Sequence, residues 1–186
     1  IPKQSLGVLY GAPGSGKSTF LKKNAPFLTS DKIWKIDADE VRSMLPEYKG
    51  WNSPTTHEEA RDIVDQLLTT YDQPCKHDLL YDGTMSNAKK YIPIIRKLKA
   101  QGYKVFVAYM DVPKEISIQR ALARYQNNSA STSEFGRYVP MTVIDDFYRT
   151  GDEGYENIKS AVDGYVKIDS QTQTVLERGG MEIPQD

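Results

Sequence analysis

An eight-residue segment near the start of the chain has the composition and spacing of a phosphate-binding loop. Its residues are Gly11, Ala12, Pro13, Gly14, Ser15, Gly16, Lys17 and Ser18, and they satisfy the pattern G-x-x-x-x-G-K-[ST]. Such glycines let backbone N–H groups close around phosphate oxygens, the lysine reaches the outer phosphates, and the serine hydroxyl binds Mg²⁺. The segment, extended to Thr19, therefore predicts binding of ATP with Mg²⁺, with GTP as an alternative nucleotide.

Carboxylates follow two apolar segments farther along the chain. Asp37 ends residues 33–37, Asp39 comes two positions later, and Asp82 ends residues 78–82. Only one of Asp37 and Asp39 can cap the helix that begins there, which leaves the other for chemistry. We expect Asp39 to orient and deprotonate an acceptor hydroxyl. We expect Asp82 to hold Mg²⁺ through water.

The order of these residues favours transfer of a phosphoryl group over its hydrolysis. Asp82 is followed by Gly83 and Thr84, without the second carboxylate that a hydrolytic site would show. Arg42 lies three residues after Asp39, on the same face of a helix, where it can hold an anionic part of the acceptor. We therefore expect the acceptor site to include Asp39 and Arg42.

Arginines flank a polar segment in the second half of the chain. Residues 126–134 are small and polar and lack an apolar rhythm, which is typical of a mobile loop or lid. Arg124 and Arg137 bracket this segment, and Arg120 lies one helical turn before Arg124. Closure of the lid would bring these guanidinium groups onto the triphosphate. The alternative for all three is a solvated helix face.

Apolar segments and helical patterns alternate along the chain. Strands are expected at residues 6–10, 33–37, 78–82, 103–111 and 164–169, and helices at 16–24, 55–71 and 86–101. This alternation predicts an α/β fold, with a five-stranded parallel sheet, helices on both faces and a single domain over residues 1–186. Ligands bind at the carboxyl ends of strands in such sheets. Glu59 falls on the apolar side of its helix, so we expect it to face the core or a cleft.

Composition narrows the classes of partner. The chain of 186 residues has 24 basic and 25 acidic residues and a pI near 6.2, so no global charge attracts it to DNA or to an anionic membrane. No apolar run is long enough to span a bilayer, and no secretory leader is evident. Cys75 is the sole cysteine, which excludes an intrachain disulfide and indicates a reducing, cytoplasmic environment.

Several motifs after the phosphate-binding segment resemble the zeta toxin family of P-loop kinases in order and spacing. They include Ile36-Asp37-Ala38-Asp39-Glu40-Val41-Arg42, Leu45-Pro46-Glu47-Tyr48, Thr56-His57-Glu58-Glu59-Ala60, Asp82-Gly83-Thr84 and Gly136-Arg137-Tyr138-Val139-Pro140. The resemblance implies a P-loop NTPase fold with an arginine-bearing lid. It implies phosphorylation of a hydroxyl of UDP-N-acetylglucosamine or a related sugar-nucleotide, and an antitoxin protein as partner.

The same resemblance implies roles for individual residues. Asp39 matches the base, and Lys17 and Ser18 match the residues that bind ATP and Mg²⁺. Arg124 and Arg137 match the arginines that neutralise the transferring phosphoryl group.

The acceptor side allows a second interpretation. Glu59 and Thr84 match positions that contact the sugar-nucleotide in zeta toxins, but Asp82 stands where that pattern has glutamate. The segments also resemble the phage-type polynucleotide 5′-hydroxyl kinases, whose acceptor motif matches Asp39 and Arg42 and whose aspartate before threonine matches Asp82. The alternative acceptor is therefore a nucleic acid, at a 5′-hydroxyl or at a hydroxymethylated base in DNA. A non-catalytic nucleotide-binding module is the third interpretation.

Overall fold

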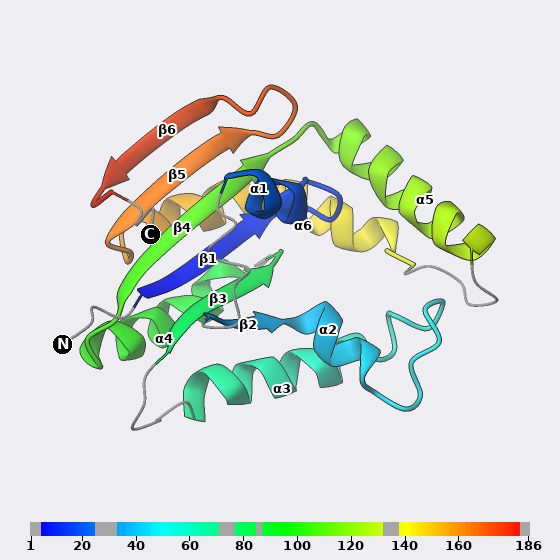
Figure 1. Ribbon diagram of the computed structural model, residues 1–186, viewed down its shortest axis with the longest axis horizontal. Helices are drawn as coiled ribbons and strands as arrows, with labels where there is room; N and C mark the ends of the chain where they lie inside the picture. Colours follow the sequence, from blue (N-terminus) through cyan, green and yellow to red (C-terminus); the bar gives the residue numbers. More distant parts are fainter. Residues whose placement is uncertain (1–4, 25–32, 71–76, 85–86, 132–137, 183–186) are drawn as a thin grey trace.

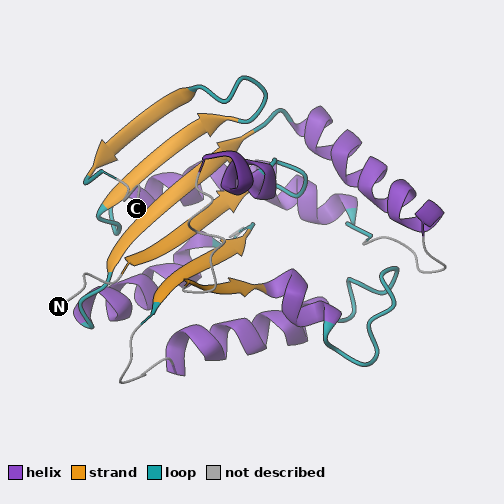
Figure 2. Cartoon of the chain, in the orientation of Figure 1, coloured by secondary structure: helices purple, strands orange, loops and turns teal. Residues whose placement is uncertain are grey.

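The computed structural model describes residues 5–24, 33–70, 77–84, 87–131 and 138–182. The strands in these ranges are β1 (Ser5–Gly11), β2 (Ile33–Asp37), β3 (Asp78–Gly83), β4 (Lys104–Asp111), β5 (Gly164–Asp169) and β6 (Val175–Gly180). The helices are α1 (Lys17–Asn24), α2 (Ala38–Ser43), α3 (His57–Thr70), α4 (Ala88–Ala100), α5 (Lys114–Ser131) and α6 (Met141–Lys159). The described strands form one sheet in the order β2-β3-β1-β4-β5-β6 (Figures 1 and 2).

The five expected strands are present, and they pair in parallel as predicted. β1 lies between β3 and β4, β2 pairs with β3, and β4 pairs with β5. The number five is wrong, because β6 joins the described part of the sheet antiparallel to β5. The turn into β6 contains Gln173 at φ 60, and β6 is mostly exposed and ends in two glycines. A strand of this kind carries no apolar pattern that sequence reasoning can detect.

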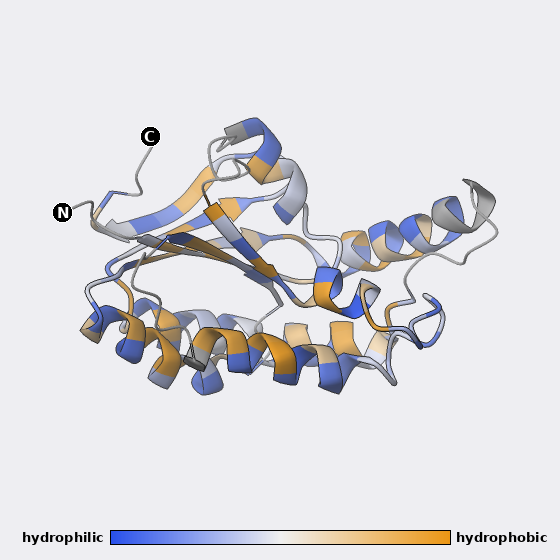
Figure 3. Ribbon diagram, turned by 60° about the horizontal axis from the view of Figure 1, so that its bottom comes forward, coloured by the Kyte–Doolittle hydropathy of each residue, from blue (hydrophilic) through white to orange (hydrophobic). Residues whose placement is uncertain are grey.

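Helices cover both faces of the sheet, as expected, but unequally. On one face, apolar residues of α3, α4 and α6 form the larger core with β1, β3 and β4. On the other face, Leu21 of α1 packs on Leu9, Leu80 and Met110 in a smaller cluster. Figure 1 shows α4 and α6 behind the sheet and α1 in front of it. Figure 3 shows the layer of helices along the larger core, each with hydrophobic and hydrophilic stretches.

Helix α6 approaches the centre of the sheet closely. The Tyr10 hydroxyl on β1 donates a hydrogen bond to the carbonyl oxygen of Gly151 at 2.7 Å. A Cβ atom at Gly154 would lie 2.7 Å from that hydroxyl and 2.9 Å from the Cβ of Ala88. Glycine at this position therefore lets α6 pack against both β1 and the start of α4.

The polar segment after Arg124 differs from the sequence-based expectation. It was expected to be a loop from residue 126, but α5 continues as helix to Ser131. Asparagine and serine are weak helix formers but do not end a helix that is already nucleated, and glutamine favours helix. Residues 132–137, which include Arg137, lie outside the described residues.

The carboxyl ends of β1, β2 and β3 meet at one edge of the sheet. The register pairs Asp37 on β2 with Asp82 on β3, and Tyr10 on β1 with Gly83. The aspartates and the segment that follows β1 are therefore neighbours, as expected. Among the described residues, no helix combines the length and apolar character needed to cross a membrane.

Candidate active site

The segment after β1 forms a tight loop whose shape depends on its glycines. Gly14 and Gly16 have φ values of 70° and 90°, in the left-handed region that favours glycine. The Ser15 N–H donates to the carbonyl oxygen of Ala12 at 3.0 Å, which closes the turn. Helix α1 begins at Lys17, so its N-terminal N–H groups face the space that the loop encloses.

The loop carries polar groups suited to phosphate oxygens. The Lys17 ammonium donates to the carbonyl oxygens of Gly11 at 3.0 Å and Ala12 at 3.2 Å. The Ser15 hydroxyl is buried and, among the described residues, has no hydrogen-bond partner. A buried hydroxyl without a partner is costly unless a ligand satisfies it. Ser15 therefore fits a nucleotide phosphate in this loop.

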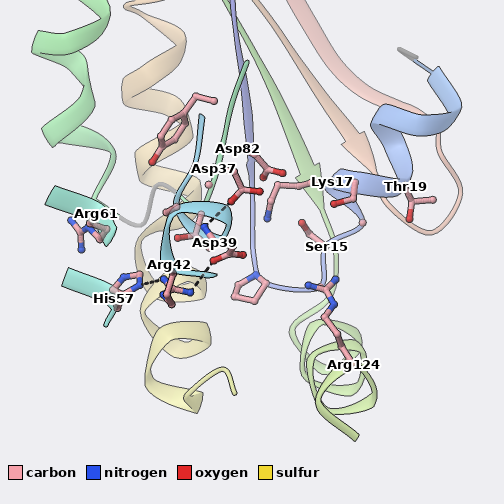
Figure 4. Close-up of a pocket in the computed structure, with 18 of the residues that line it drawn as sticks. Ser15, Lys17, Thr19, Asp37, Asp39, Arg42, His57, Arg61, Asp82 and Arg124 are labelled. Carbon is pink, nitrogen blue, oxygen red and sulfur yellow. Dashed lines mark hydrogen bonds and ion pairs between the residues drawn. The ribbon is translucent and has the colours of Figure 1, made fainter. Parts of the chain in front are cut away.

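A cleft opens between the loop, the ends of β2 and β3, and helices α2, α3 and α5 (Figure 4). Its lining includes residues that the sequence analysis singled out: Pro13, Gly14, Ser15, Gly16, Lys17, Ser18, Thr19, Asp39, Arg42, Asp82, Thr84 and Arg124. It also includes His57, Arg61, Asn87 and Tyr91, to which the sequence analysis assigned no role. These last residues come from α3 and from the start of α4, and only the packing of those helices on the sheet brings them to the cleft.

Asp37 and Asp39 have separate roles. Asp37 caps α2, because its carboxylate accepts a hydrogen bond from the Asp39 N–H at 2.8 Å. The Asp39 carboxylate is 45% exposed and lines the cleft. The expectation that one of the two aspartates caps the helix is therefore confirmed, and the chemical role of Asp39 remains a prediction.

Arg42 is the most unusual side chain of the cleft, because it is charged and only 1% exposed. One guanidinium nitrogen pairs with the Asp39 carboxylate at 2.9 Å, and another donates to His57 Nδ1 at 2.6 Å. His57 accepts this bond only when Nδ1 carries no proton. Nothing in the local sequence links residue 57 to residue 42, because the contact forms only when α3 packs on α2. Figure 4 shows the resulting line of Asp39, Arg42 and His57.

Asp82 lies deep in the cleft beside the loop. Burial raises the pKa of its carboxyl group, and the charge of Lys17 partly offsets this rise. Asp82 and the Ser18 hydroxyl line the same cleft. A carboxylate and a hydroxyl, completed by nucleotide phosphates and water, match the oxygen ligands that Mg²⁺ uses in nucleotide sites. These residues therefore fit the metal that the loop implies.

The two arginines of α5 point to different places. Arg124 lines the cleft, as expected, and Figure 4 shows its guanidinium directed toward the loop. Arg120, expected at the nucleotide, is absent from the cleft lining. One of its guanidinium nitrogens instead donates to the carbonyl oxygen of Gly14 at 3.2 Å and to the Ser170 hydroxyl at 3.0 Å. A spacing of four residues placed both on α5, but it could not show that the loop lies against the first of them.

Glu59 does not face the core or the cleft. It is exposed in the first turn of α3 and is not part of the cleft lining. A hydrogen bond to Glu47 and the charge of that residue raise the pKa of Glu59. The apolar contacts of α3 with the core begin at Ala60. The prediction for Glu59 was wrong because it extended the apolar side of the helix one turn too far toward the N-terminus. The contact of Glu59 with the acceptor remains a prediction.

The phosphate loop after β1, the mostly parallel sheet and the arginine of α5 define this chain as a P-loop kinase. The sequence model of the family described as Zeta toxin matches residues 2–181. The chain belongs to the zeta toxin family.

Similar proteins include a curated relative and solved structures. The toxin PezT of Streptococcus pneumoniae serotype 4 is 29% identical over 133 residues, which are 67% of this chain and 51% of the relative. This chain therefore spans about half of that relative. A structure from the PezAT chromosomal toxin-antitoxin system of the same species has a TM-score of 0.73 at 19% identity, covering 100% of this chain and 75% of the other. The crystal structure of AvrRxo1-ORF1:-ORF2 with ATP has a TM-score of 0.67 at 18% identity, covering 90% and 55%.

Proposed function

We propose that this protein transfers the γ-phosphoryl group of ATP to a hydroxyl of a sugar-nucleotide such as UDP-N-acetylglucosamine. The observation that carries the proposal is the Asp39 carboxylate, which lines the same cleft as Lys17 and is paired with the buried Arg42. A module that only senses nucleotide would need the phosphate loop but no oriented carboxylate beside it. Membership of the zeta toxin family supports the same activity.

The residues of the cleft supply what in-line phosphoryl transfer needs. Asp39 accepts the proton of the acceptor hydroxyl. The oxygen of that hydroxyl forms a bond to the γ-phosphorus, while the bond between the γ-phosphorus and the β–γ bridging oxygen breaks and ADP leaves. Lys17 and Arg124 place positive charge beside the migrating group. Ser18, and Asp82 through water, would hold Mg²⁺, which would supply positive charge to the phosphates. Arg42 keeps the Asp39 carboxylate in one orientation.

The acceptor side of the cleft is suited to an anionic molecule. Arg42, Arg61 and His57 line it opposite the phosphate loop. Cationic and hydrogen-bonding groups of this kind bind phosphate oxygens, and the diphosphate of a sugar-nucleotide provides them. Thr84 and Asn87 add uncharged polar groups for sugar hydroxyls. A 5′-hydroxyl polynucleotide also carries phosphates and is therefore the second candidate acceptor.

A protein partner is part of the proposal. The PezAT structure, to which this chain is similar in fold, comes from a toxin-antitoxin system. We infer that an antitoxin protein binds this chain and controls its activity. Purification from cells that coexpress the gene's neighbours, followed by analysis of copurifying chains, tests this part.

The function is tested with γ-labelled ATP, Mg²⁺ and a panel of acceptors. The panel contains UDP-N-acetylglucosamine and related sugar-nucleotides, 5′-hydroxyl DNA and RNA oligonucleotides, and DNA with hydroxymethylated pyrimidines. We expect label on the sugar-nucleotide and none with a Lys17→Met variant. Label on an oligonucleotide alone would replace the acceptor and keep the mechanism, whereas label on no acceptor, with nucleotide still bound, would contradict the proposed transfer.

A further inference from the structure

The outer side of the phosphate loop is held by side chains from two distant parts of the chain. The Ser117 hydroxyl on α5 donates to the carbonyl oxygen of Pro13 at 2.6 Å. Arg120, one turn later, donates to the carbonyl oxygen of Gly14. The Ser170 hydroxyl, just after β5, donates to the carbonyl oxygen of Ser15 at 2.5 Å. Three consecutive carbonyl groups of the loop are thus bound by Ser117, Arg120 and Ser170, which we call the loop-supporting cluster.

Arg120 links the members of this cluster. The same guanidinium nitrogen donates to the Gly14 carbonyl at 3.2 Å and to the Ser170 hydroxyl at 3.0 Å. Ser117 is fully buried and Ser170 is 7% exposed, so water does not compete for these bonds. Loss of Arg120 would therefore free one loop carbonyl directly and loosen the donor of a second.

The direction of these carbonyls determines the direction of the N–H groups beside them. In a trans peptide the C=O of one residue and the N–H of the next point opposite ways, and the described peptide bonds include no cis bond. The Pro13 carbonyl, held by Ser117, therefore directs the Gly14 N–H away from α5. The Ser15 carbonyl, held by Ser170, directs the Gly16 N–H away from Ser170. N–H groups turned this way bind phosphate oxygens, whereas a carbonyl turned inward would repel them.

Close packing leaves the loop little freedom to move away from the cluster. A Cβ atom at Gly14 would lie 3.0 Å from the Cβ of Arg120, and one at Gly16 would lie 3.0 Å from the Ser170 hydroxyl. Both glycines have positive φ values. The loop is therefore fitted to the cluster by shape as well as by hydrogen bonds.

We propose that Arg120, with Ser117 and Ser170, is a positioning residue that holds the phosphate loop in its triphosphate-binding form. The inference rests on the proposed nucleotide site, but it assigns Arg120 to the backbone of the loop and not to the base or to the transferring group. Arg120 and Arg124 then act at different steps: Arg120 sets the affinity for triphosphate, and Arg124 acts on the group in transfer.

Calorimetric titration of wild type and Arg120→Ala with three Mg²⁺ complexes tests this inference directly. The ligands are ATP, GTP and inorganic tripolyphosphate. For each ligand that the wild type binds, we expect the affinity of Arg120→Ala to be lower by about the same factor, roughly tenfold to 100-fold. The reason is that two hydrogen bonds from a charged donor are lost. Arg120→Lys should recover part of the affinity, since it restores one charged donor, and added guanidinium ion should recover part of it in Arg120→Ala.

Matched variants separate this role from a general effect on folding. Arg149→Ala removes an exposed arginine of α6 that pairs with Asp146 at 2.8 Å, and it should leave all affinities unchanged. Ser170→Ala removes a smaller donor of the cluster and should weaken binding by about threefold to tenfold. It also provides a test if Arg120→Ala does not fold.

Specific outcomes would overturn the inference. A loss confined to ATP, with tripolyphosphate bound as in wild type, would place Arg120 at the base. A lower Tm of Arg120→Ala with unchanged affinities would make the role of Arg120 merely structural. Weaker binding that neither Arg120→Lys nor guanidinium ion recovers would also contradict the inference. A wild-type chain that binds none of the ligands would overturn the nucleotide site, and this inference with it. Tight binding without phosphoryl transfer would contradict only the proposed function.

Discussion

The two sides of the cleft differ in the interactions that hold their functional groups. On the phosphate side, backbone carbonyls of the loop accept hydrogen bonds from Ser117, Arg120 and Ser170. On the acceptor side, side chains hold side chains, because the buried Arg42 connects the Asp39 carboxylate to His57. The phosphate side is therefore held through hydrogen bonds to its backbone, and the acceptor side through interactions between charged and polar side chains.

This difference corresponds to the two tasks of a kinase. A triphosphate is bound the same way in every cycle. A loop that is already ordered by its backbone contacts therefore needs little further ordering, so binding carries a small entropic cost. A base must hold a charge and then accept a proton, which requires a side chain whose partners tolerate the change. Substitutions on the two sides should therefore affect different kinetic constants.

The largest effect is expected from Asp39→Asn. The amide cannot accept the proton of the acceptor, so turnover should fall roughly 100-fold to 10,000-fold, while the affinity for ATP stays near that of wild type. Steady-state kinetics combined with nucleotide titration measures both quantities. Asp62→Asn, at an exposed position on α3, is the control. Turnover unchanged by Asp39→Asn would remove Asp39 as the base.

Arg42→Lys should have the next largest effect. Lysine keeps the charge but lacks the planar fork that bonds Asp39 and His57 together. We expect turnover to fall about tenfold or more, with KM for ATP nearly constant. An equal increase in KM for ATP would mean that the two sides of the cleft are not independent, contrary to the comparison above.

His57 allows a finer test with a pair of variants. In His57→Gln the amide oxygen can still accept the hydrogen bond from Arg42, so turnover should stay within about threefold of wild type. His57→Leu leaves a buried donor of Arg42 without its partner and should lower turnover by roughly tenfold. If both variants behave alike, hydrogen bonding to Arg42 is not the contribution of His57.

The smallest effect, on stability, is expected from Asp82→Asn. Burial raises the pKa of Asp82 in the folded chain, so its protonated form stabilises the fold below the unfolded pKa of about 3.9. This contribution is lost as the pH rises through the folded pKa, and the neutral amide avoids the loss. At pH 7 the variant should melt about 2–4 °C higher, although its Mg²⁺-dependent transfer should fall. The difference in Tm should disappear toward pH 4, and a lower Tm at pH 7 would contradict the explanation.

Local features of the fold and site were predictable, and long-range ones were not. The phosphate loop and the parallel strands follow from motif and apolar pattern, which act over a few residues. The partner of Arg42, the contact of Arg120 with the loop and the exposure of Glu59 depend on how separate helices pack. Helix α6 was not predicted, because Gly151 and Gly154 weaken its local helical signal. The close approach to Tyr10 explains Gly154, whereas a Cβ atom at Gly151 would lie against the Phe147 ring.

The separation in sequence between the loop and its supports has a consequence for synthesis on the ribosome. Ser15 leaves the ribosome before Ser170, which binds its carbonyl and follows 155 residues later. β1 likewise cannot pair until β3 and β4, its neighbours in the sheet, have been synthesised. Domains generally fold as units once their strands are available. A nascent chain shorter than this carries the whole phosphate-binding motif without a finished site. Nucleotide binding by such a chain would therefore report completion of the sheet and not the presence of the motif.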